Sequence, residues 1–281
     1  MTSSTRCTVA RPVRYEGTGI HTGKPCSLEI RPGGAGQGIL LRRAGTVWPD
    51  LPACIEHANA EKSDRRTVLT GPAGQTFEQL EHVMAALAAA GITDALLVQD
   101  GLEPPFLDGG SREYMEGLLT AGREELVGEL EPLVIREPIH LNWEGAELVA
   151  TPHEGLRLSC YVEFPGTVVG SQGASVEITP ESFRDEVAAA RTFALERDIE
   201  ALRAAGLAKG GTLQNAVVFN ESRYLNDSLF FEDEVARHKI LDLLGDLALI
   251  GRPLRGHFWA WKAGHRHHIH FARLIAKGET R

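Results

Sequence analysis

Three side chains in the stretch of residues 231–251 have the types and the spacing of a metal site. On a helix, His238, Asp242 and Asp246 would lie one turn apart in a column on one face. A histidine and an aspartate four residues apart can hold one metal ion between them, as the paired histidines of the H-E-x-x-H motif do. An ordinary amphipathic helix with a solvated polar face would show the same column. A third ligand and a base are therefore needed before the column indicates chemistry.

Glu81 and His82 form the second candidate pair, and the alanine-rich run VMAALAAAG follows them. Small side chains allow close helix packing, so we expect the pair to lie against a neighbouring element rather than on a free surface. A lone histidine in that setting is more often a hydrogen-bonded structural residue than a ligand. If His82 meets His238 and Asp242, however, two imidazoles and one carboxylate leave a fourth position open, which is the arrangement of a catalytic zinc.

Such a site would have its acid–base partners close by. Zinc lowers the pKa of bound water from ~15.7 to ~7, and Glu81 could take the proton of that water. A protonated His265 could stabilise the oxyanion or protonate the leaving amine, with Asp246 orienting it. Lys239 and Lys262 are further candidate cations. Spacing alone does not bring the two halves of the chain together, so these roles are hypotheses.

Helices are expected to carry these groups. Acids at residues 232–234, Gly251 and Pro253 predict one helix over residues 231–251. The TFEQ sequence at residues 76–79 fits a capping box that would open a helix ending at Gly91. Further helical patterning covers residues 112–119 and 182–206.

Strand patterns precede the helices in each half of the chain, and this order predicts an α+β fold with two similar domains, residues 1–127 and 128–281, rather than alternating βαβ units. Residues 124–131 read as the linker between them. There is no P-loop and no G-x-G-x-x-G between a strand and a helix, so nucleotide hydrolysis and dinucleotide binding are poorly supported. The strand-like runs are residues 26–30, 39–41, 95–98, 132–140, 147–151 and 156–163.

The composition is ordinary for a soluble globular protein, with 43% hydrophobic and 24% charged residues. A net charge of −9 argues against a nucleic-acid binder. Four scattered cysteines without a C-x-x-C pair favour a reducing compartment and argue against a thiolate zinc site. The first residues lack an apolar export segment, and no apolar run reaches the ~20 residues of a spanning helix. We therefore expect a cytoplasmic protein without stable membrane insertion.

Several separated motifs give the chain a resemblance to a known family. The sequences GTGIHTGKP, LEHVMAALAAAGITDALLV, LDGGS and HKILDLLGDLALIGRP, in that order, resemble the UDP-3-O-acyl-N-acetylglucosamine deacetylases of lipid A biosynthesis. The similarity runs from about residue 7 to residue 275. It implies a zinc amidase with two similar α+β domains, each a sheet packed against helices, and a site between them. Its substrate would be a UDP-linked, 3-O-acylated N-acetylglucosamine.

The resemblance also implies roles for individual residues. His82, His238 and Asp242 match the zinc ligands, and Glu81 matches the general base. His265 matches the catalytic histidine, supported by Asp246. The positions that match substrate contacts are Lys239, Thr192 at the reacting carbonyl oxygen, Phe193 by the fatty-acyl passage, and Glu163, Phe164 and Lys262 at the uridine and diphosphate.

The chain departs from the family after His265, where a run such as ALNNKL is replaced by RHHIHFAR. This puts in doubt the packing behind His265 but not its identity. The histidines of this run, His267, His268 and His270, could bind a second metal, although a structural or solvated tail is the simpler interpretation.

We expect one catalytic Zn²⁺, with Fe²⁺ as the alternative ion in the cell, and a monomer whose only partner is its small-molecule substrate. Three rival functions remain. One is a zinc amidohydrolase that acts on a different N-acetylated sugar nucleotide, and another is a non-catalytic homologue that binds a nucleotide sugar. The third, a purely structural metal protein, fits poorly with an open fourth position.

Overall fold

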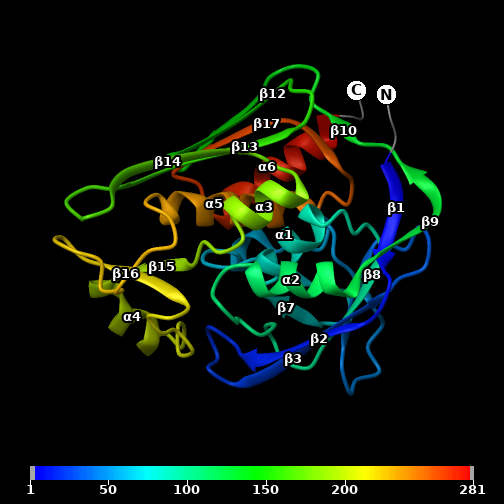
Figure 1. Cartoon of the computed structure of the whole chain (residues 1–281), viewed down its shortest axis with the longest axis horizontal. Coiled ribbons are helices and arrows are strands. Elements are labelled where there is room, and N and C mark those ends of the chain that lie inside the picture. Colours follow the sequence, from blue (N-terminus) through cyan, green and yellow to red (C-terminus); the bar gives the residue numbers. More distant parts are fainter. Residues whose placement is uncertain (1–3, 279–281) are drawn as a thin grey trace.

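The computed structural model describes residues 4–278 and arranges them in layers, with helices between two β-sheets (Figure 1). The central pair of helices is α1 (Glu81–Ala89) and α5 (Glu234–Ala248), which pack against each other. One hydrophobic core includes residues of both sheets and both helices. The packing of the two halves is therefore continuous across the middle of the molecule.

The five-stranded sheet, at the bottom right of Figure 1, comes from the first half of the chain. Its strand order is β2-β3-β8-β4-β5, with β4 parallel to β8 and the other neighbours antiparallel. Side chains alternate between the faces of a strand, and the inward ones here, such as Leu28, Ile30 and Leu97, are fully buried. The bounds are β2 (Val13–Thr18), β3 (Pro25–Pro32), β4 (Ile39–Arg43), β5 (Leu51–Pro52) and β8 (Ala95–Gln99).

The six-stranded sheet, at the top of Figure 1, comes from the second half. Its order is β11-β12-β17-β13-β14, and β10 pairs with the start of β17. Helix α5 packs on β13 and β14, and α6 (His265–Gly278) packs on β11 and β12. The bounds are β10 (Leu133–Val134), β11 (Ile139–Trp143), β12 (Ala146–Thr151), β13 (Leu156–Phe164), β14 (Gly170–Glu177) and β17 (Leu254–Trp261).

Three two-stranded sheets and the shorter helices complete the described fold. The β15–α4–β16 segment extends from the left side of the molecule (Figure 1). The pairs are β1 (Ser4–Val9) with β9 (Arg123–Leu130), β6 (Val68–Thr70) with β7 (Thr76–Glu78), and β15 (Thr192–Leu195) with β16 (Ala216–Phe219). The other helices are η1 (Ala60–Lys62), α2 (Arg112–Ala121), α3 (Pro180–Glu186), η2 (Glu196–Asp198) and α4 (Ile199–Ala204).

A glycine sets the distance between the two central helices. A Cβ atom at Gly245 of α5 would overlap the carbonyl oxygen of Glu81 in α1. Only glycine lets the two backbones approach so closely. Because Glu81 and His82 open α1, and His238 and Asp242 lie on α5, this contact also brings the candidate site residues together.

The predicted α+β fold, with sheets packed against helices, is confirmed. The helix predicted over residues 231–251 forms as α5, and Gly251 just beyond it has a φ of 76°, as a helix-ending glycine often does. The predicted boundary between residues 127 and 128 falls inside β9. The division into two domains at that point stays a prediction.

Three local predictions were wrong. Residues 76–78 form β7 and pair with β6, Gln79 takes a φ of 58°, and α1 begins at Glu81 with no side-chain cap, so the capping box does not exist. Residues 124–131 are not a linker, because β9 pairs with β1. The helical pattern over residues 182–206 is interrupted by β15, which pairs with β16. In each case pairing with another strand, near in the sequence for β7 and far for β9, overrides the local pattern.

None of the helices within residues 4–278 combines the length and the apolar character that crossing a lipid bilayer requires.

Candidate metal centre and active site

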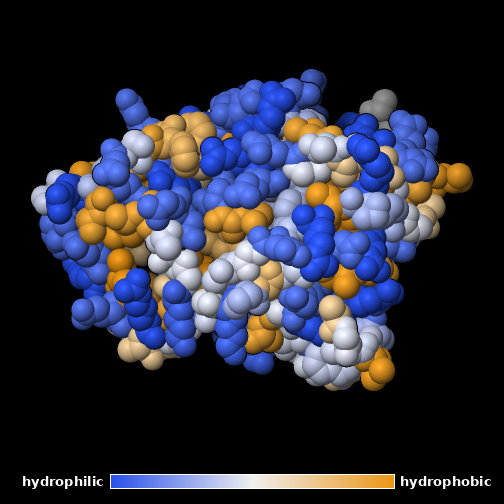
Figure 2. All heavy atoms as spheres, turned by 60° about the horizontal axis from the view of Figure 1, so that its bottom comes forward, coloured by the Kyte–Doolittle hydropathy of each residue, from blue (hydrophilic) through white to orange (hydrophobic). Residues whose placement is uncertain are grey.

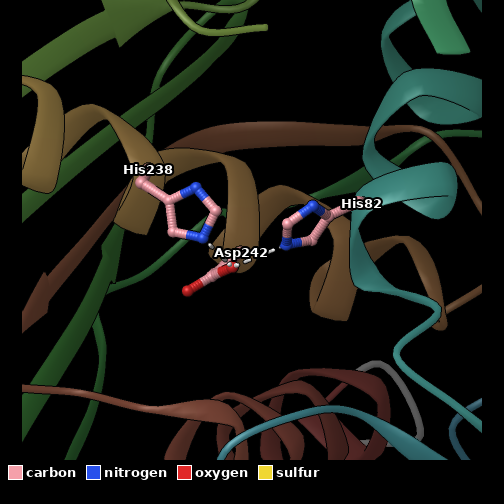
Figure 3. Close-up of side chains that lie close together, drawn as sticks. All are labelled: His82, His238 and Asp242. Atoms are coloured by element: carbon pink, nitrogen blue, oxygen red, sulfur yellow. Dashed lines mark ion pairs between the residues drawn. The ribbon is translucent and has the colours of Figure 1, made fainter. Parts of the chain in front are cut away.

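His82, His238 and Asp242 converge at the contact between α1 and α5 (Figure 3). His82 Nε2 lies 3.9 Å from Asp242 Oδ1, and His238 Nε2 lies 3.3 Å from the same oxygen. Ligand atoms about 2 Å from a tetrahedral zinc ion stand about 3.3 Å apart, so the spacing suits a shared ion. All three residues are buried. The two halves of the chain thus meet as the sequence analysis required.

Backbone carbonyl groups orient both imidazole rings. His82 Nδ1 lies 3.0 Å from the carbonyl oxygen of Gly110, and His238 Nδ1 lies 2.9 Å from that of Ala190. A carbonyl oxygen only accepts, so each Nδ1 must carry the proton and donate it. Each Nε2 then keeps its lone pair, and both lone pairs are directed towards Asp242 (Figure 3). Metal-binding histidines commonly have this arrangement.

The glycines of the DGGS loop permit these backbone contacts. A Cβ at Gly109, whose φ is 85°, would overlap the carbonyl oxygen of Asn215, and a Cβ at Gly110 would overlap that of Ala188. The loop therefore lies directly against the segment that leads to Ala190. The two carbonyl groups that orient the ligand histidines come from these neighbouring segments.

The charge states of the three side chains also suit a cation. Burial lowers the pKa of His82 to about 3, helped by the neighbouring His238, and burial likewise lowers the pKa of His238. Both imidazoles are thus neutral near pH 7. Burial alone would raise the pKa of Asp242, but Lys239 and the histidines hold that pKa well below its usual range. Two neutral imidazoles and an ionised carboxylate form a donor set that fits zinc.

Glu81 stands beside these ligands with one oxygen anchored and the other without a partner. Its Oε2 accepts a hydrogen bond of 3.0 Å from the backbone N–H of Thr67. Its Oε1 is buried, has no hydrogen-bond partner among residues 4–278, and lies 3.8 Å from His265 Nε2. Burial raises the pKa of Glu81 to about 7. A carboxylate with these properties can act as a base near neutral pH.

His265, at the start of α6, faces Glu81 from the opposite side of the site. Its Nδ1 lies 2.8 Å from Asp246 Oδ2, and its Nε2 lies 4.0 Å from Asp242 Oδ2. Burial alone would lower the pKa of His265, but the carboxylates of Asp246, Glu81 and Asp242 raise it to about 9. A histidine that stays protonated at neutral pH can donate a proton or stabilise an oxyanion.

Lys239 is already engaged in the site. Its Nζ donates a hydrogen bond of 2.7 Å to Asp242 Oδ2. The other oxygen, Oδ1, is the one that His82 and His238 approach. The lysine side chain is only 12% exposed. Lys239 therefore neutralises part of the carboxylate charge.

Phe193, predicted at the acyl passage, and Phe164, predicted at the uridine and diphosphate, belong to one aromatic cluster next to the metal site. The Phe193 ring lies 5.6 Å from Phe164 and 6.0 Å from His238, measured between centroids. Thr192, beside Phe193 at the start of β15, donates its backbone N–H to the carbonyl oxygen of Gly109.

On the face in Figure 2, hydrophilic residues predominate and the hydrophobic ones form small separate groups. The exposed apolar residues near the β15–α4–β16 segment include Val168, Leu213 and Phe230.

Glu163 and Lys262 pair with each other where β13 and β17, two neighbouring interior strands of the six-stranded sheet, end. Lys262 Nζ lies 2.5 Å from Glu163 Oε2 and 4.5 Å from the centre of the Trp261 ring. Lys262 has a φ of 53°, an uncommon conformation for a residue with a side chain. Such backbone strain is often found at functional sites. The structure thus brings these two predicted diphosphate contacts together as an ion pair.

Sequence reasoning missed two residues behind the site. Thr67 precedes β6 and contacts both Glu81 and Asp246, and His268 of α6 lies 2.7 Å from Asp246 Oδ2 through its Nδ1. No spacing rule connects Thr67 to residues so distant in the chain. His268 was visible only as part of a histidine-rich run. Together with Asp246, these two residues form the packing behind His265 that the departure from the ALNNKL run had left in doubt.

The site as a whole has the components of a metal-assisted hydrolase. It contains a donor set for one ion, a carboxylate that can accept a proton, and a histidine that can supply one. His265 Nε2 lies 3.8 Å from Glu81 Oε1 and 4.0 Å from Asp242 Oδ2. Asp246, His265 and His268 form a second group of potential ligands. In that group, however, both histidines direct Nδ1 at Asp246 as hydrogen-bond donors.

Comparison with known proteins gives one consistent answer. The sequence profile of the family described as UDP-3-O-acyl N-acetylglycosamine deacetylase matches residues 6–277. The UDP-3-O-acyl-N-acetylglucosamine deacetylase of Leptospira biflexa is 36% identical over 276 residues, covering 98% of this chain and 91% of that protein. The similarly named protein of Thermosynechococcus vestitus is 36% identical over 279 residues, covering 99% and 96%. That of Bdellovibrio bacteriovorus is 37% identical over 260 residues, covering 92% and 85%.

Proposed function

Because this chain belongs to the UDP-3-O-acyl N-acetylglycosamine deacetylase family, we propose that the site between α1 and α5 carries out the reaction of that family. The enzyme is an amidase of lipid A biosynthesis. It hydrolyses the acetamide of UDP-3-O-acyl-N-acetylglucosamine and releases acetate and the free 2-amino sugar nucleotide.

His82, His238 and Asp242 would hold the metal ion, which we propose to be Zn²⁺, with Fe²⁺ as the alternative in the cell. When bound, the ion would polarise the substrate carbonyl and acidify water. The single observation that carries this assignment is the convergence of one histidine from α1 with a histidine–aspartate pair from α5. The backbone hydrogen bonds of both Nδ1 atoms support it as well.

Glu81 and His265 would move the protons of the reaction. As water adds to the acetyl carbonyl carbon, Glu81 Oε1 takes one proton from it. When the carbon–nitrogen bond breaks, the sugar nitrogen takes a proton from His265 Nε2, and acetic acid leaves and gives up the second water proton to solvent to become acetate. Asp246 holds His265 with Nε2 facing Glu81, and the 3.8 Å between Glu81 Oε1 and His265 Nε2 supports this division of roles.

The remaining predicted residues would bind the substrate. Lys239 and Thr192 would contact the reacting end, and Phe193 would line the acyl passage, which is supported by its place in the aromatic cluster beside His238. Glu163, Phe164 and Lys262 would contact the uridine and diphosphate. The anionic diphosphate would compete with Glu163 for Lys262, since both anions need the same ammonium group.

We also propose that the enzyme works as a monomer in the cytoplasm. All three candidate ligands, the base and the acid come from one chain, so the site needs no second copy. The four cysteines are free, which suits a reducing compartment. Size measurement of the purified protein and fractionation of cells test these two statements.

The function is tested by measuring the metal content and the release of acetate from UDP-3-O-acyl-N-acetylglucosamine and from the non-acylated sugar nucleotide. Glu81→Gln should lower kcat by about 10² to 10⁴ while the zinc content stays at the wild-type level, because a base is lost but no ligand. His238→Ala should instead lose zinc. Glu78→Gln is the matched control, since Glu78 pairs with Arg66 outside the site.

Each alternative gives a different result. Zinc without turnover of either substrate would indicate a non-catalytic nucleotide-sugar-binding protein. Turnover of only the non-acylated compound would indicate an amidohydrolase for a different sugar nucleotide. Wild-type activity in Glu81→Gln would remove Glu81 from the role of general base.

A further inference from the structure

The carboxylate of Asp246 is surrounded by three hydrogen-bond donors. His265 Nδ1 and His268 Nδ1 lie 2.8 and 2.7 Å from the same oxygen, Oδ2, and the Thr67 hydroxyl donates to Oδ1. Asp246 is fully buried. With donors on both oxygens, the carboxylate cannot rotate about its χ2 angle without breaking at least one hydrogen bond.

Although both imidazoles bind Asp246 in the same way, only one faces the site. His265 Nε2 lies 3.8 Å from Glu81 Oε1, whereas His268 Nε2 has no hydrogen-bond partner among residues 4–278 and its side chain is completely buried. Burial lowers the pKa of His268 to about 4, so this ring is neutral. His268 therefore acts on the site through Asp246 and not through contact with a substrate.

Thr67 connects the two ends of the proton-transfer pair. Its backbone N–H donates to Glu81 Oε2 at 3.0 Å, and its hydroxyl donates to Asp246 Oδ1. It is 1% exposed. Thr67 thus anchors Oε2 of Glu81, which leaves Oε1 free, and it also anchors the carboxylate that orients His265.

We propose that Thr67 and His268 are positioning residues of the deacetylase, which together lock Asp246 so that His265 Nε2 stays directed at Glu81. This inference rests on the proposed function for its kinetic consequence but not for its geometry. Without His268, only His265 would remain on Oδ2. Without the Thr67 hydroxyl, Oδ1 would be a buried acceptor with no donor, and the carboxylate would turn towards His268 or His265.

Each residue offers a pair of variants that separates loss of the donor from loss of the side chain. Thr67→Val removes the hydroxyl at almost constant volume, and Thr67→Ser keeps it. His268→Leu removes the donor, whereas His268→Asn keeps an N–H at the same number of bonds from Cα as Nδ1. His270→Leu is the control on the same helix, since His270 makes an edge-on contact with Trp143 instead, with the ring centroids 4.5 Å apart.

We expect Thr67→Val and His268→Leu to lower kcat about 10- to 100-fold, the usual effect of losing a group that orients a functional residue, with KM and zinc content unchanged. Thr67→Ser and His268→Asn should restore most of the lost kcat, and His270→Leu should match the wild type. Loss of zinc or a rise in KM in the valine and leucine variants would overturn the proposal, as would failure of serine and asparagine to restore activity.

A measurement without turnover keeps this test separate from that of the function. In the NMR spectrum of the zinc-loaded protein with labelled histidine, the Nδ1–H of His265, bonded to a carboxylate, should give a downfield resonance. That resonance should shift or broaden in Thr67→Val and His268→Leu and stay in place in the rescue variants. An unchanged resonance in all four would overturn the positioning role even if the wild type deacetylates its substrate. The expected shifts in a protein without deacetylase activity would overturn only the proposed function.

Discussion

Asp94 is a buried carboxylate that joins three segments of the first half of the chain. Arg6 Nη1 and the backbone N–H of Gly38 donate to Oδ1 at 3.0 and 2.9 Å, and the Thr93 hydroxyl donates to Oδ2 at 2.6 Å. Burial opposes ionisation, but these donors hold the pKa of Asp94 below its usual value of 3.8. The ionised form is therefore the one that stabilises the fold.

Replacing Asp94 gives a pH-dependent effect of defined sign. Because the folded-state pKa lies below 3.8, the carboxylate stabilises the protein above that pH and loses this effect as the pH falls through the folded-state value. Asp94→Asn should lower the free energy of unfolding by about 1–3 kcal/mol at pH 7, with the difference shrinking below pH 4. Urea unfolding of the wild type and of Asp94→Asn, at pH 7 and below pH 4, measures this difference.

The exposed pair of Arg184 and Asp185 provides the control. Asp185→Asn should leave the free energy of unfolding unchanged at pH 7 and below pH 4, since water screens an exposed ion pair. If Asp94→Asn lowered the free energy of unfolding equally at both pH values, the shape of the side chain and not its charge would matter at this position.

At the residue scale, the sequence predicted site residues that lie close together because they share one helix. It did not predict site residues that come together only when distant segments pack. The four-residue interval between His238 and Asp242 directs both towards one point, and α5 keeps them there. Thr67 lies 179 positions from Asp246, and its side chain has no chemistry of its own to draw attention. Contacts of this kind appear only once the packing is known.

At the element scale, Gly245 decides whether α1 and α5 can touch. Replacing a helical glycine with alanine usually stabilises a helix by up to about 1 kcal/mol. Here the added methyl group would overlap the Glu81 carbonyl oxygen, so Gly245→Ala should instead destabilise the protein by about 1–3 kcal/mol. It should also weaken zinc binding, because the ligands come from both helices. Thermal unfolding and metal titration measure the two effects.

Gly34→Ala is a suitable control, because the nearest atom that a Cβ would meet there is 3.5 Å away. Its stability and zinc affinity should equal those of the wild type. Wild-type zinc affinity in Gly245→Ala would mean that the helices can separate without moving the ligands.

The element predictions succeeded where a segment's own pattern matched its burial. Helix α5 has an apolar arc on one side and a terminating glycine, and both features are local. The element predictions failed where pairing with another strand determined the secondary structure of a segment. Strand β9 is largely exposed and reads as a polar linker, but it is held by β1, more than 100 residues earlier in the chain. The TFEQ sequence resembles a helix start, yet β6 takes its first three residues into a hairpin.

At the scale of the whole molecule, a shared ion would join the two halves. His82 comes from the first half, and His238 and Asp242 come from the second. An ion that binds the folded protein at 1,000 times its Kd adds about 4 kcal/mol to the free energy of unfolding. Removing zinc with a chelator should therefore lower Tm by several degrees, and returning zinc should restore it.

His238→Ala supplies the comparison for this experiment. Its Tm should no longer respond to zinc or to the chelator, since one of the three ligands is gone. A variant that keeps the full zinc-dependent shift would place the stabilising ion elsewhere in the protein.

The carbonyl groups of Gly110 and Ala190 have an evolutionary consequence. Every amino acid carries a carbonyl oxygen, so no exchange of side chain can delete the acceptors that fix the tautomers of His82 and His238. Only a substitution that shifts the backbone can disturb this arrangement, and Gly109 and Gly110 are the positions where an added Cβ would do so. During evolution, substitutions of the side chains around the two imidazoles should therefore be accepted, whereas substitutions of the two glycines should be eliminated.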